Sequence, residues 1–391
     1  MFRRIYLDNA ATTPLDPRVL EAMMPYLTED FGNASSIHYF GQRARAAVDK
    51  ARHEVADLIN SRPNEIVFTS GGTESNNLAV RGLLQANAKY GRHIIATAIE
   101  HPAVRNVLED LEKDGAQVTF LPAATTGVVS VDDLRAAIRQ DTVLITVMTA
   151  NNEIGTLQPV DEIGKIVRDL RSAGKKIWFH TDAVQAAGKI RLDVEEIGCD
   201  LLSISAHKIY GPKGVGALYV RRGTRLHSQN IGGRQERGIR GGTEAVAPIV
   251  GFGAAARLAS DEIDTEPRRI AALRDRLERS ILESISGTAV NGDVTRRLPN
   301  ITNISFAGVE GEGLLINLDI RGIAVSTGSA CSSGSLEPSP VIRALGASDQ
   351  TARTAIRFSL GRQNVDDVEM ILQQLSEAVG DLRRISAASS K

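Results

Sequence analysis

Short apolar runs alternate with amphipathic helical stretches between about residues 50 and 220, and this pattern constrains the fold more than any other feature of the chain. Runs typical of buried strands cover residues 65–69, 93–99, 143–149, 176–180 and 201–205, whereas residues 74–87, 131–139 and 160–173 have helical spacing. Strands that are apolar on both faces and separated by helices indicate βαβ units. We therefore predict an α/β fold with a mostly parallel central sheet flanked by helices.

The pattern changes after about residue 245. A stretch rich in Ala and Gly leads into a charged helix at 266–283, shorter strands follow at 300–306, 323–326 and 354–359, and a last helix covers 365–385. With 391 residues, the chain exceeds the size at which one hydrophobic core usually stops growing. We predict a large domain of residues 14–255 and a smaller α+β domain formed by residues 1–13 and 256–391.

Composition argues against several classes of function. A net charge of −1 gives no general attraction to nucleic acid or to an anionic membrane. No apolar run is long enough to cross a bilayer, and the first residues have no signal core. The two cysteines, Cys199 and Cys331, cannot build a disulfide framework, and neither lies in a Cys/His metal pattern. We expect a cytoplasmic protein with reduced thiols, no metal site of its own, and no nucleic-acid or membrane partner.

A glycine pair joins the first predicted strand to the helix that follows it, in the run Phe-Thr-Ser-Gly-Gly-Thr-Glu-Ser-Asn-Asn at 68–77. Thr73 is a good helix N-cap residue. Unpaired amides and the helix dipole would favour a phosphate bound near Gly72 and Thr73. A plain glycine turn with a cap explains the same residues, and a short glycine motif alone does not decide between the two.

Two charged residues come directly after predicted buried strands. Asp182 follows the strand at 176–180, at the carboxyl edge where ligands bind in open α/β folds. It is either a helix cap or a residue that keeps a pyridine nitrogen protonated. Lys208 ends the run Ser-Ala-His-Lys after the strand at 201–205, and a lysine at the edge of a cleft can form a Schiff base. Lys213, in a Gly-Pro-Lys-Gly turn, fits a solvated loop charge better.

Cys331 lies in a run of small residues, Gly-Ser-Ala-Cys-Ser-Ser-Gly-Ser at 328–335. Nothing near it in the sequence offers apolar neighbours, so packing does not explain it. Cys199 enters a predicted buried strand and is expected to be inert core. We therefore favour a reactive thiol at Cys331.

Polar residues also follow two further predicted strands. Glu100 and His101 come after the strand at 93–99, and Asn151 and Asn152 come after the strand at 143–149. A lone histidine in such a place is more often structural. His101 is therefore a candidate site residue only because the other motifs lie at the same edge. Because several parallel strands then end in polar motifs at one edge, a shared site explains the arrangement directly.

The chain between residues 6 and 362 resembles the cysteine desulfurases, in particular the group that supplies sulfur for iron–sulfur cluster assembly. Cysteine desulfurases are fold-type I enzymes that depend on pyridoxal 5′-phosphate (PLP). Two motifs carry the resemblance: Ser-Ile-Ser-Ala-His-Lys-Ile-Tyr-Gly-Pro-Lys-Gly at 203–214 and Gly-Ser-Ala-Cys-Ser-Ser-Gly-Ser-Leu-Glu-Pro-Ser at 328–339. The resemblance implies the fold of fold-type I PLP-dependent transferases. The large domain would then bind PLP, and the small domain would carry the loop of Cys331.

The resemblance also implies roles for individual residues. Lys208 is similar to the lysine that binds PLP, Asp182 to the partner of the pyridine nitrogen, and His101 to the histidine that stacks on the ring and moves protons. Gln185 matches the donor to the phenolic oxygen. Asn152 and Arg357 match the residues that hold the substrate carboxylate. The implied phosphate ligands are Gly72, Thr73, Ser205, His207 and, from a neighbouring subunit, Thr243.

The implied reaction removes sulfur from L-cysteine, releases L-alanine and leaves a persulfide on Cys331, with Lys208 as the base. The implied partners are a second copy of the chain, in a homodimer, and a protein acceptor such as an iron–sulfur scaffold. Cys331 is also a candidate transient ligand of a cluster.

The residues alone leave two alternative functions open. A selenocysteine lyase or an aminotransferase could use the same fold, although an aminotransferase has no need of a reactive thiol. A non-enzymatic sulfur or metal carrier could use Cys331, although the wide separation of the two cysteines argues against it.

Overall fold

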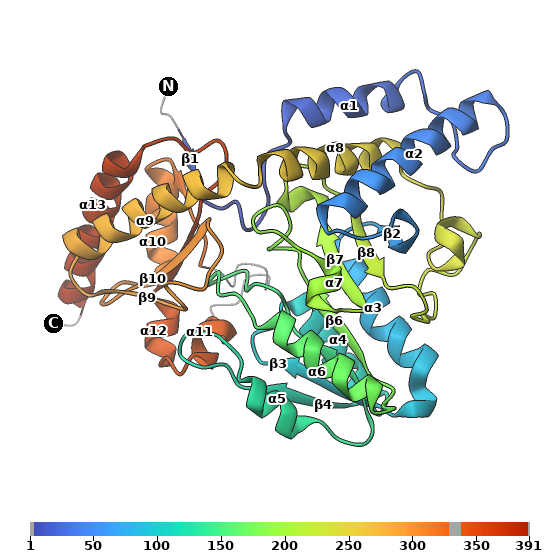
Figure 1. Cartoon of the computed structure of the whole chain (residues 1–391). Coiled ribbons are helices and arrows are strands. Elements are labelled where there is room, and N and C mark those ends of the chain that lie inside the picture. Colours follow the sequence, from blue (N-terminus) through green and yellow to red (C-terminus); the bar gives the residue numbers. More distant parts are fainter. Residues whose placement is uncertain (1–3, 328–337, 390–391) are drawn as a thin grey trace.

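A seven-stranded sheet forms the centre of the larger part of the molecule in a computed structural model that describes residues 4–327 and 338–389 (Figure 1). Strand β8 (Gly216–Val220) is antiparallel to both its neighbours, and the other six strands run in one direction, so the predicted mostly parallel sheet is confirmed. Across the sheet the order is β2 (Ile66–Thr69), β8, β7 (Leu201–Ser205), β6 (Trp178–Asp182), β5 (Thr142–Thr146), β3 (His93–Thr97) and β4 (Gln117–Leu121).

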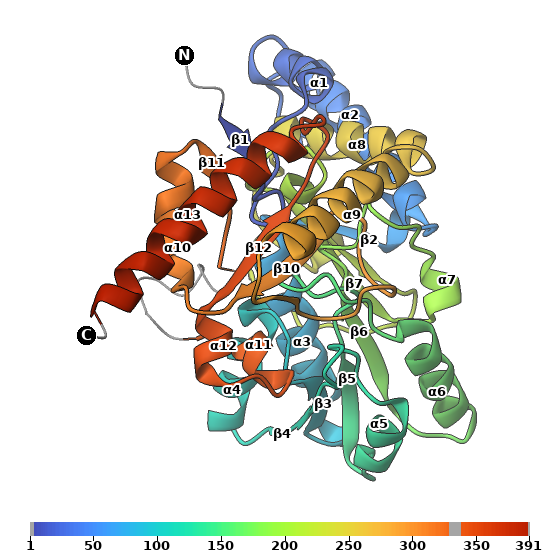
Figure 2. The ribbon, with the colours of Figure 1, turned by 90° about the vertical axis from the view of Figure 1, so that its left-hand side faces the viewer.

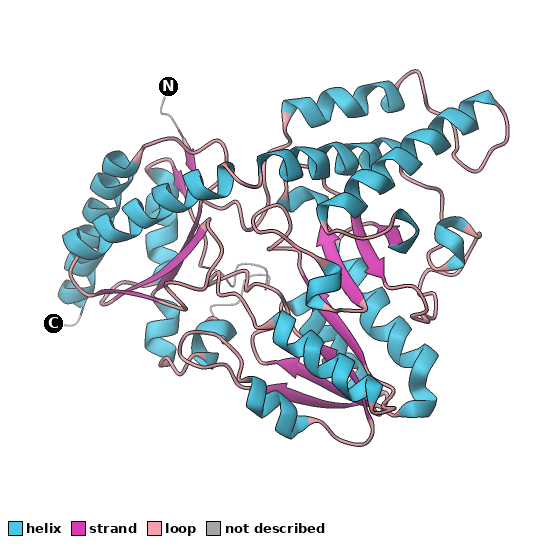
Figure 3. Ribbon diagram, in the orientation of Figure 1, coloured by secondary structure: helices cyan, strands magenta, loops and turns pink. Residues whose placement is uncertain are grey.

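Helices cover both faces of this sheet, because successive side chains of its strands point to opposite faces and are apolar on both. On β3, Ile95 packs into one apolar core, whereas Ile94 and Ala96 pack into a second one. The first core is closed by α1 (Pro17–Leu27), α2 (Tyr39–Leu58), α5 (Val131–Ala137), α6 (Val160–Ser172), α7 (Val194–Ile197) and α8 (Val246–Glu262), and the second by α3 (Gly72–Asn87) and α4 (Pro102–Lys113). Figure 3 shows the strands inside this helical layer.

The smaller part of the molecule has its own sheets and its own core. Strand β10 (Ile301–Phe306) pairs antiparallel with β9 (Thr288–Val290) and β12 (Ala355–Ser359), and the N-terminal β1 (Ile5–Tyr6) pairs parallel with β11 (Ile323–Ala324). The helices of this part are α9 (Glu266–Ser284), α10 (Gly311–Ile320), α11 (Pro340–Ala344), α12 (Asp349–Arg353) and α13 (Val368–Ser389). Figure 2 shows α9, α10 and α13 around its strands.

We propose that residues 14–255 form the large domain and that residues 1–13 and 256–391 form the small one. Within the described residues, the core of the smaller part draws on residues 5–7 and 270–379, so the N-terminus belongs to it. Helix α8 continues across residue 255, and Leu258 still packs in the first core of the larger part. No helix in the described ranges combines the length and the apolar character needed to span a membrane.

Candidate active site

One cavity of about 220 Å³ lies at the carboxyl edge of the seven-stranded sheet. It collects the residues that follow β2, β3, β5, β6 and β7, because parallel strands all end at this edge. Of the residues selected from the sequence, Gly72, Thr73, His101, Asn152, Asp182, Gln185, Ser205, His207 and Lys208 line it.

Lys208 enters this cavity from the short 3₁₀ turn Ala206–Lys208 that follows β7. Its Nζ donates hydrogen bonds to the main-chain oxygens of Ala10, at 2.5 Å, and Ala11, at 2.7 Å. These acceptors come from the N-terminal segment, which crosses from the smaller part of the molecule. The lysine is therefore held inside the site by neutral oxygens that a ligand can replace.

Asp182 is the last residue of β6, and its side chain is buried. Its Oδ2 accepts a hydrogen bond from Asn76 Nδ2 at 2.7 Å, and its Oδ1 accepts one from the Val184 amide at 3.0 Å. Both donors are neutral, and within the described residues Asp182 has no salt bridge. Its negative charge is thus available to a cationic atom of a ligand.

His101 is the N-cap residue of α4, and its Nδ1 accepts a hydrogen bond from the Ala103 amide at 3.1 Å. This bond places the proton of the neutral ring on Nε2. Burial lowers the pKa of His101, so the ring is uncharged at neutral pH. An uncharged flat ring on the cavity wall suits stacking against an aromatic ligand.

The N-terminus of α3 points its first main-chain amides toward one end of the site. Its N-cap is Gly71, whose φ of 154° disfavours any other residue, and not the predicted Thr73, and no side chain of the described residues caps the helix. A Cβ at Gly72 would lie 2.8 Å from Val184 Cγ2, so only glycine lets the helix end approach this closely. The hollow beside it is also lined by Ser205, His207 and Lys213. Lys213 is exposed in a turn, as predicted, and also lines this hollow.

Three buried polar atoms in the cavity lack partners among the described residues: Asn76 Oδ1, Gln185 Oε1 and Ser205 Oγ. Folded proteins rarely leave such atoms unpaired, so they indicate a polar ligand. Gln185 Nε2 donates to the Ala10 oxygen at 2.9 Å, which leaves an acceptor facing the site. If the side-chain amide of Gln185 were rotated by half a turn, its Nε2 would face the site as the donor that the resemblance implies. The hydrogen bond to the Ala10 oxygen would then be lost.

Arg357 lies on β12 of the smaller part, is 3% exposed, and does not itself line the cavity but contacts Asn152, which does. Its Nη1 donates to the Asn152 main-chain oxygen at 2.9 Å, and its Nη2 binds Asp8 Oδ1 at 2.7 Å. Its Nε has no partner in the described part of the chain. The guanidinium already binds one carboxylate beside Asn152, and its unused donor fits a second.

Two other predicted residues, Thr243 and Cys199, do not line the cavity, and a third, Cys331, is not described. Thr243 is exposed, on a segment that the ion pair between Arg240 and Glu74, at 2.8 Å, fastens to α3. Cys331 lies in residues 328–337, outside the described residues. Cys199 is fully buried, and burial raises the pKa of its thiol, so its prediction as core is confirmed.

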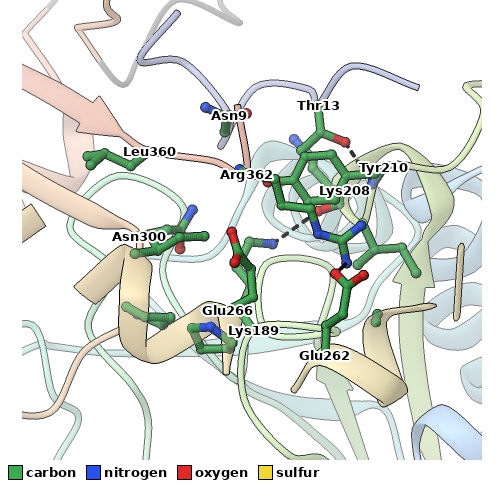
Figure 4. Close-up of a pocket in the computed structure, with 16 residues that line it drawn as sticks. Asn9, Thr13, Lys189, Lys208, Tyr210, Glu262, Glu266, Asn300, Leu360 and Arg362 are labelled. Carbon is green, nitrogen blue, oxygen red and sulfur yellow. Dashed lines mark hydrogen bonds and ion pairs between the residues drawn. The ribbon is translucent and has the colours of Figure 1, made fainter. Parts of the chain in front are cut away.

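A second cavity also reaches Lys208, between the larger and smaller parts of the molecule (Figure 4). It leaves about 30 Å³ for the centres of water molecules, which is room for one or two waters. Lys189 donates from Nζ to the Lys208 main-chain oxygen at 3.2 Å, and burial lowers the pKa of Lys189 to about 7. Both polar side-chain atoms of Asn300, which also lines this cavity, lack partners in the described ranges.

The sequence analysis did not select Asn76 or Asp8, although both contact the predicted residues. Asn76 lies three positions after Thr73 on α3, and this spacing places both on one helix face, a signal that could have identified it. Asp8 binds a residue 349 positions away, and no local pattern predicts such a contact.

Comparison with known proteins agrees with this geometry. The model of the family described as aminotransferase class-V matches residues 5–371. The chain belongs to the class-V aminotransferase family. Among its relatives, the protein named cysteine desulfurase IscS of Dictyoglomus turgidum is 50% identical over 387 residues, which cover 99% of this chain and 97% of that protein. The protein of the same name from Methanosarcina thermophila is 48% identical over 390 residues, covering 100% and 95%.

Solved structures of the family have the same fold. A structure titled NifS-like protein is 36% identical and has a TM-score of 0.90, with 97% of this chain and 100% of that chain covered. One titled SspA in complex with cysteine is 37% identical, with a TM-score of 0.81 and coverage of 92% and 100%. The sheet, the helical layers and the smaller part described above are therefore those of this family.

Proposed function

We propose that this class-V aminotransferase family member is a cysteine desulfurase that depends on PLP. It takes the sulfur of L-cysteine, releases L-alanine and leaves a persulfide on Cys331. One observation carries the proposal: Lys208, Asp182 and His101 converge on one cavity, in a chain that shares half its residues with a protein named cysteine desulfurase.

The residues of the cavity fit PLP. Asp182 would face the pyridine nitrogen, His101 would stack on the ring, and Lys208 would form the covalent bond. The end of α3 with Thr73, Ser205 and His207 would hold the phosphate, and burial, which lowers the pKa of His207 to about 4, makes that histidine a neutral donor. When bound, PLP supplies an electron sink for the bond electrons released at the α-carbon of an amino acid.

The chain's own residues then have separate tasks. Arg357 and Asn152 hold the carboxylate of the substrate, and Lys208 Nζ removes its α-proton. The thiolate of Cys331 attacks the substrate sulfur, so that a sulfur–sulfur bond forms as the carbon–sulfur bond breaks. His101 Nε2 carries a proton to the carbon skeleton, which leaves as alanine.

We further propose that two copies of the chain form a homodimer in which Thr243 of each copy reaches the phosphate of the other. Large apolar side chains are exposed near this segment, with Phe31 at 71%, Ile37 at 91% and Ile231 at 85% exposure. Arg45 links the two regions, because it binds the Ala34 oxygen at 3.2 Å and Glu244 at 2.6 Å.

The persulfide would pass to a protein acceptor such as an iron–sulfur scaffold, and Cys331 would hold a cluster only in passing. A cytoplasmic location belongs to the same proposal, since Cys331 must stay reduced to act.

The absorption spectrum of the purified protein tests the cofactor and the substrate together. We expect a visible band from lysine-bound PLP, and a shift of this band when L-cysteine is added. A protein that stays colourless after incubation with PLP would remove the cofactor and the proposal with it.

The variant Arg357→Lys should bind cysteine poorly. Lysine cannot make the paired hydrogen bonds of a guanidinium, so we expect KM for cysteine to rise about 10- to 100-fold while the visible band of the cofactor stays unchanged. Steady-state alanine release measures KM, and the exposed Arg279→Lys on α9 is the matched control. An unchanged KM would exclude Arg357 as the carboxylate ligand.

A further inference from the structure

Glu100 is a buried acid that the proposed reaction does not use. It lies between β3 and α4, directly before His101, and is 4% exposed. Its Oε1 accepts hydrogen bonds from Thr97 Oγ1 at 2.8 Å and from the Met148 amide at 3.0 Å. Its Oε2 has no hydrogen-bonding partner among the residues that the structure describes.

This hydrogen-bond pattern favours a neutral acid, because both forms leave Oε2 unpaired among the described residues and a buried charge costs more than a buried hydroxyl. An ionised carboxylate shares its charge between both oxygens, and a buried charged oxygen without a donor is costly. Neither Thr97 nor Met148 brings a positive charge to Glu100. In agreement, burial raises the pKa of Glu100 to about 8, and the negative charge of Asp182 acts in the same direction.

The contacts of Glu100 join two walls of the candidate active site. Thr97 ends β3, whereas Met148 follows β5, the neighbouring strand, and lines the cavity together with His101. Through Oε1, Glu100 therefore fixes the end of β3 to the segment after β5, one residue before His101. His101, the next residue, lines the cavity.

Three charged or titratable groups surround Glu100. Asp182 ends the next strand, β6, and His101 begins α4. Arg105, one turn further along α4, donates to the Ala98 oxygen at 3.2 Å and binds Glu109. Arg105 is thus engaged elsewhere, and an ionised Glu100 would place a second negative charge near Asp182.

We propose that Glu100 is a positioning residue of the active site: as a neutral acid it ties the end of β3 to the segment after β5 and so holds His101 over the cavity. The inference rests on the proposed desulfurase function. Loss of the proton leaves a negative oxygen without a donor near Asp182, which draws water to it and displaces the turn that carries His101.

The variant Glu100→Gln tests this, because its amide keeps an acceptor for Thr97 and Met148 but cannot ionise. We would measure kcat for alanine release and the visible circular dichroism of the bound cofactor between pH 7 and pH 10. For the wild-type holoenzyme we expect kcat to fall about tenfold per pH unit above the pKa of the required acid, and the dichroism to change over the same range. The glutamine variant should lack both changes.

Two further variants complete the test. Glu100→Leu removes the acceptor, and we expect a kcat about 10- to 100-fold below the wild-type value at pH 7, without the fall at higher pH, and with altered dichroism but a cofactor that stays bound. The exposed Glu109→Gln on α4 is the matched control and should follow the wild type. The proposal would be overturned if kcat fell at high pH in Glu100→Gln as it does in the wild type. It would also be overturned if the kcat of Glu100→Gln were as low as that of Glu100→Leu.

Unfolding measurements separate this inference from the proposed function. Because the pKa of Glu100 is raised in the folded state, the wild type should lose stability relative to Glu100→Gln as the pH rises from 5 to 9. If no cysteine turnover is found, the desulfurase proposal fails, and the unfolding and dichroism data still decide the claim on Glu100. The contrary outcome is that Glu100→Gln gains stability relative to the wild type as the pH rises while the two proteins keep the same dichroism profile. This result would make Glu100 a structural acid and reject its positioning role.

Discussion

Replacing Lys208 by alanine should abolish the protein-linked cofactor and lower cysteine turnover by at least about 10³-fold. Lys208 has two tasks in the proposed reaction, the covalent bond to PLP and the removal of the α-proton. Its Nζ already lies in the cavity, within 2.5 Å and 2.7 Å of the Ala10 and Ala11 oxygens. No other amine in the described ranges lies among the residues that line this cavity.

Borohydride trapping followed by peptide mapping measures this effect. In the wild type, the reduced cofactor should be found on the peptide that contains Lys208, and in Lys208→Ala on no peptide. The exposed Lys176→Ala is the control and should trap cofactor normally. Cofactor trapped on Lys189 or Lys213 in Lys208→Ala would contradict the choice of lysine. Both are near the site, because Lys189 lines the second cavity and Lys213 lines the hollow beside the N-terminus of α3.

Replacing Cys331 by alanine should stop sulfur transfer, by at least about 10³-fold, and leave the cofactor site intact. The variant should keep its visible band and should still exchange the α-hydrogen of cysteine for deuterium from the solvent, because Lys208 is unchanged. Cys199 cannot replace the lost nucleophile, since it is fully buried and burial raises the pKa of its thiol.

Three measurements on each variant separate the steps: the visible spectrum, deuterium exchange by NMR and alanine release. Cys199→Ala is the matched control and should release alanine at the wild-type rate. Wild-type alanine release by Cys331→Ala would reject the assignment of the nucleophile. Loss of the cofactor band in that variant would instead give Cys331 a structural role.

The sequence predicted most of the larger part of the fold, because its signal is local. Apolar runs separated by helical spacing indicate parallel strands, and the strands at 66–69, 93–97 and 201–205 lie within or match the predicted runs. The position of the antiparallel β8 between β2 and β7 was not predicted, since strand order is decided by packing between segments far apart in the chain. Strand β4 was missed because it is an edge strand, only one of whose residues is buried.

The candidate site was predictable where its residues follow strands. Asp182 ends β6 and Lys208 comes shortly after β7, and the parallel direction of these strands alone brings them to one edge. The contact between Arg357 and Asp8 joins β12 to the N-terminal segment, so it depends on how segments far apart in the chain pack together within the smaller part. Glu100 was noted only as a neighbour of His101, because its hydrogen-bond pattern becomes visible only in three dimensions.

The most direct test of the desulfurase function follows the sulfur itself. The holoenzyme would be mixed with L-cysteine without reductant, and the alanine formed and the mass of the Cys331 peptide would be measured in the first turnover. We predict one alanine for each Cys331 peptide that gains one sulfur atom. Alanine without added sulfur on Cys331, or a keto acid in place of alanine, would contradict the account.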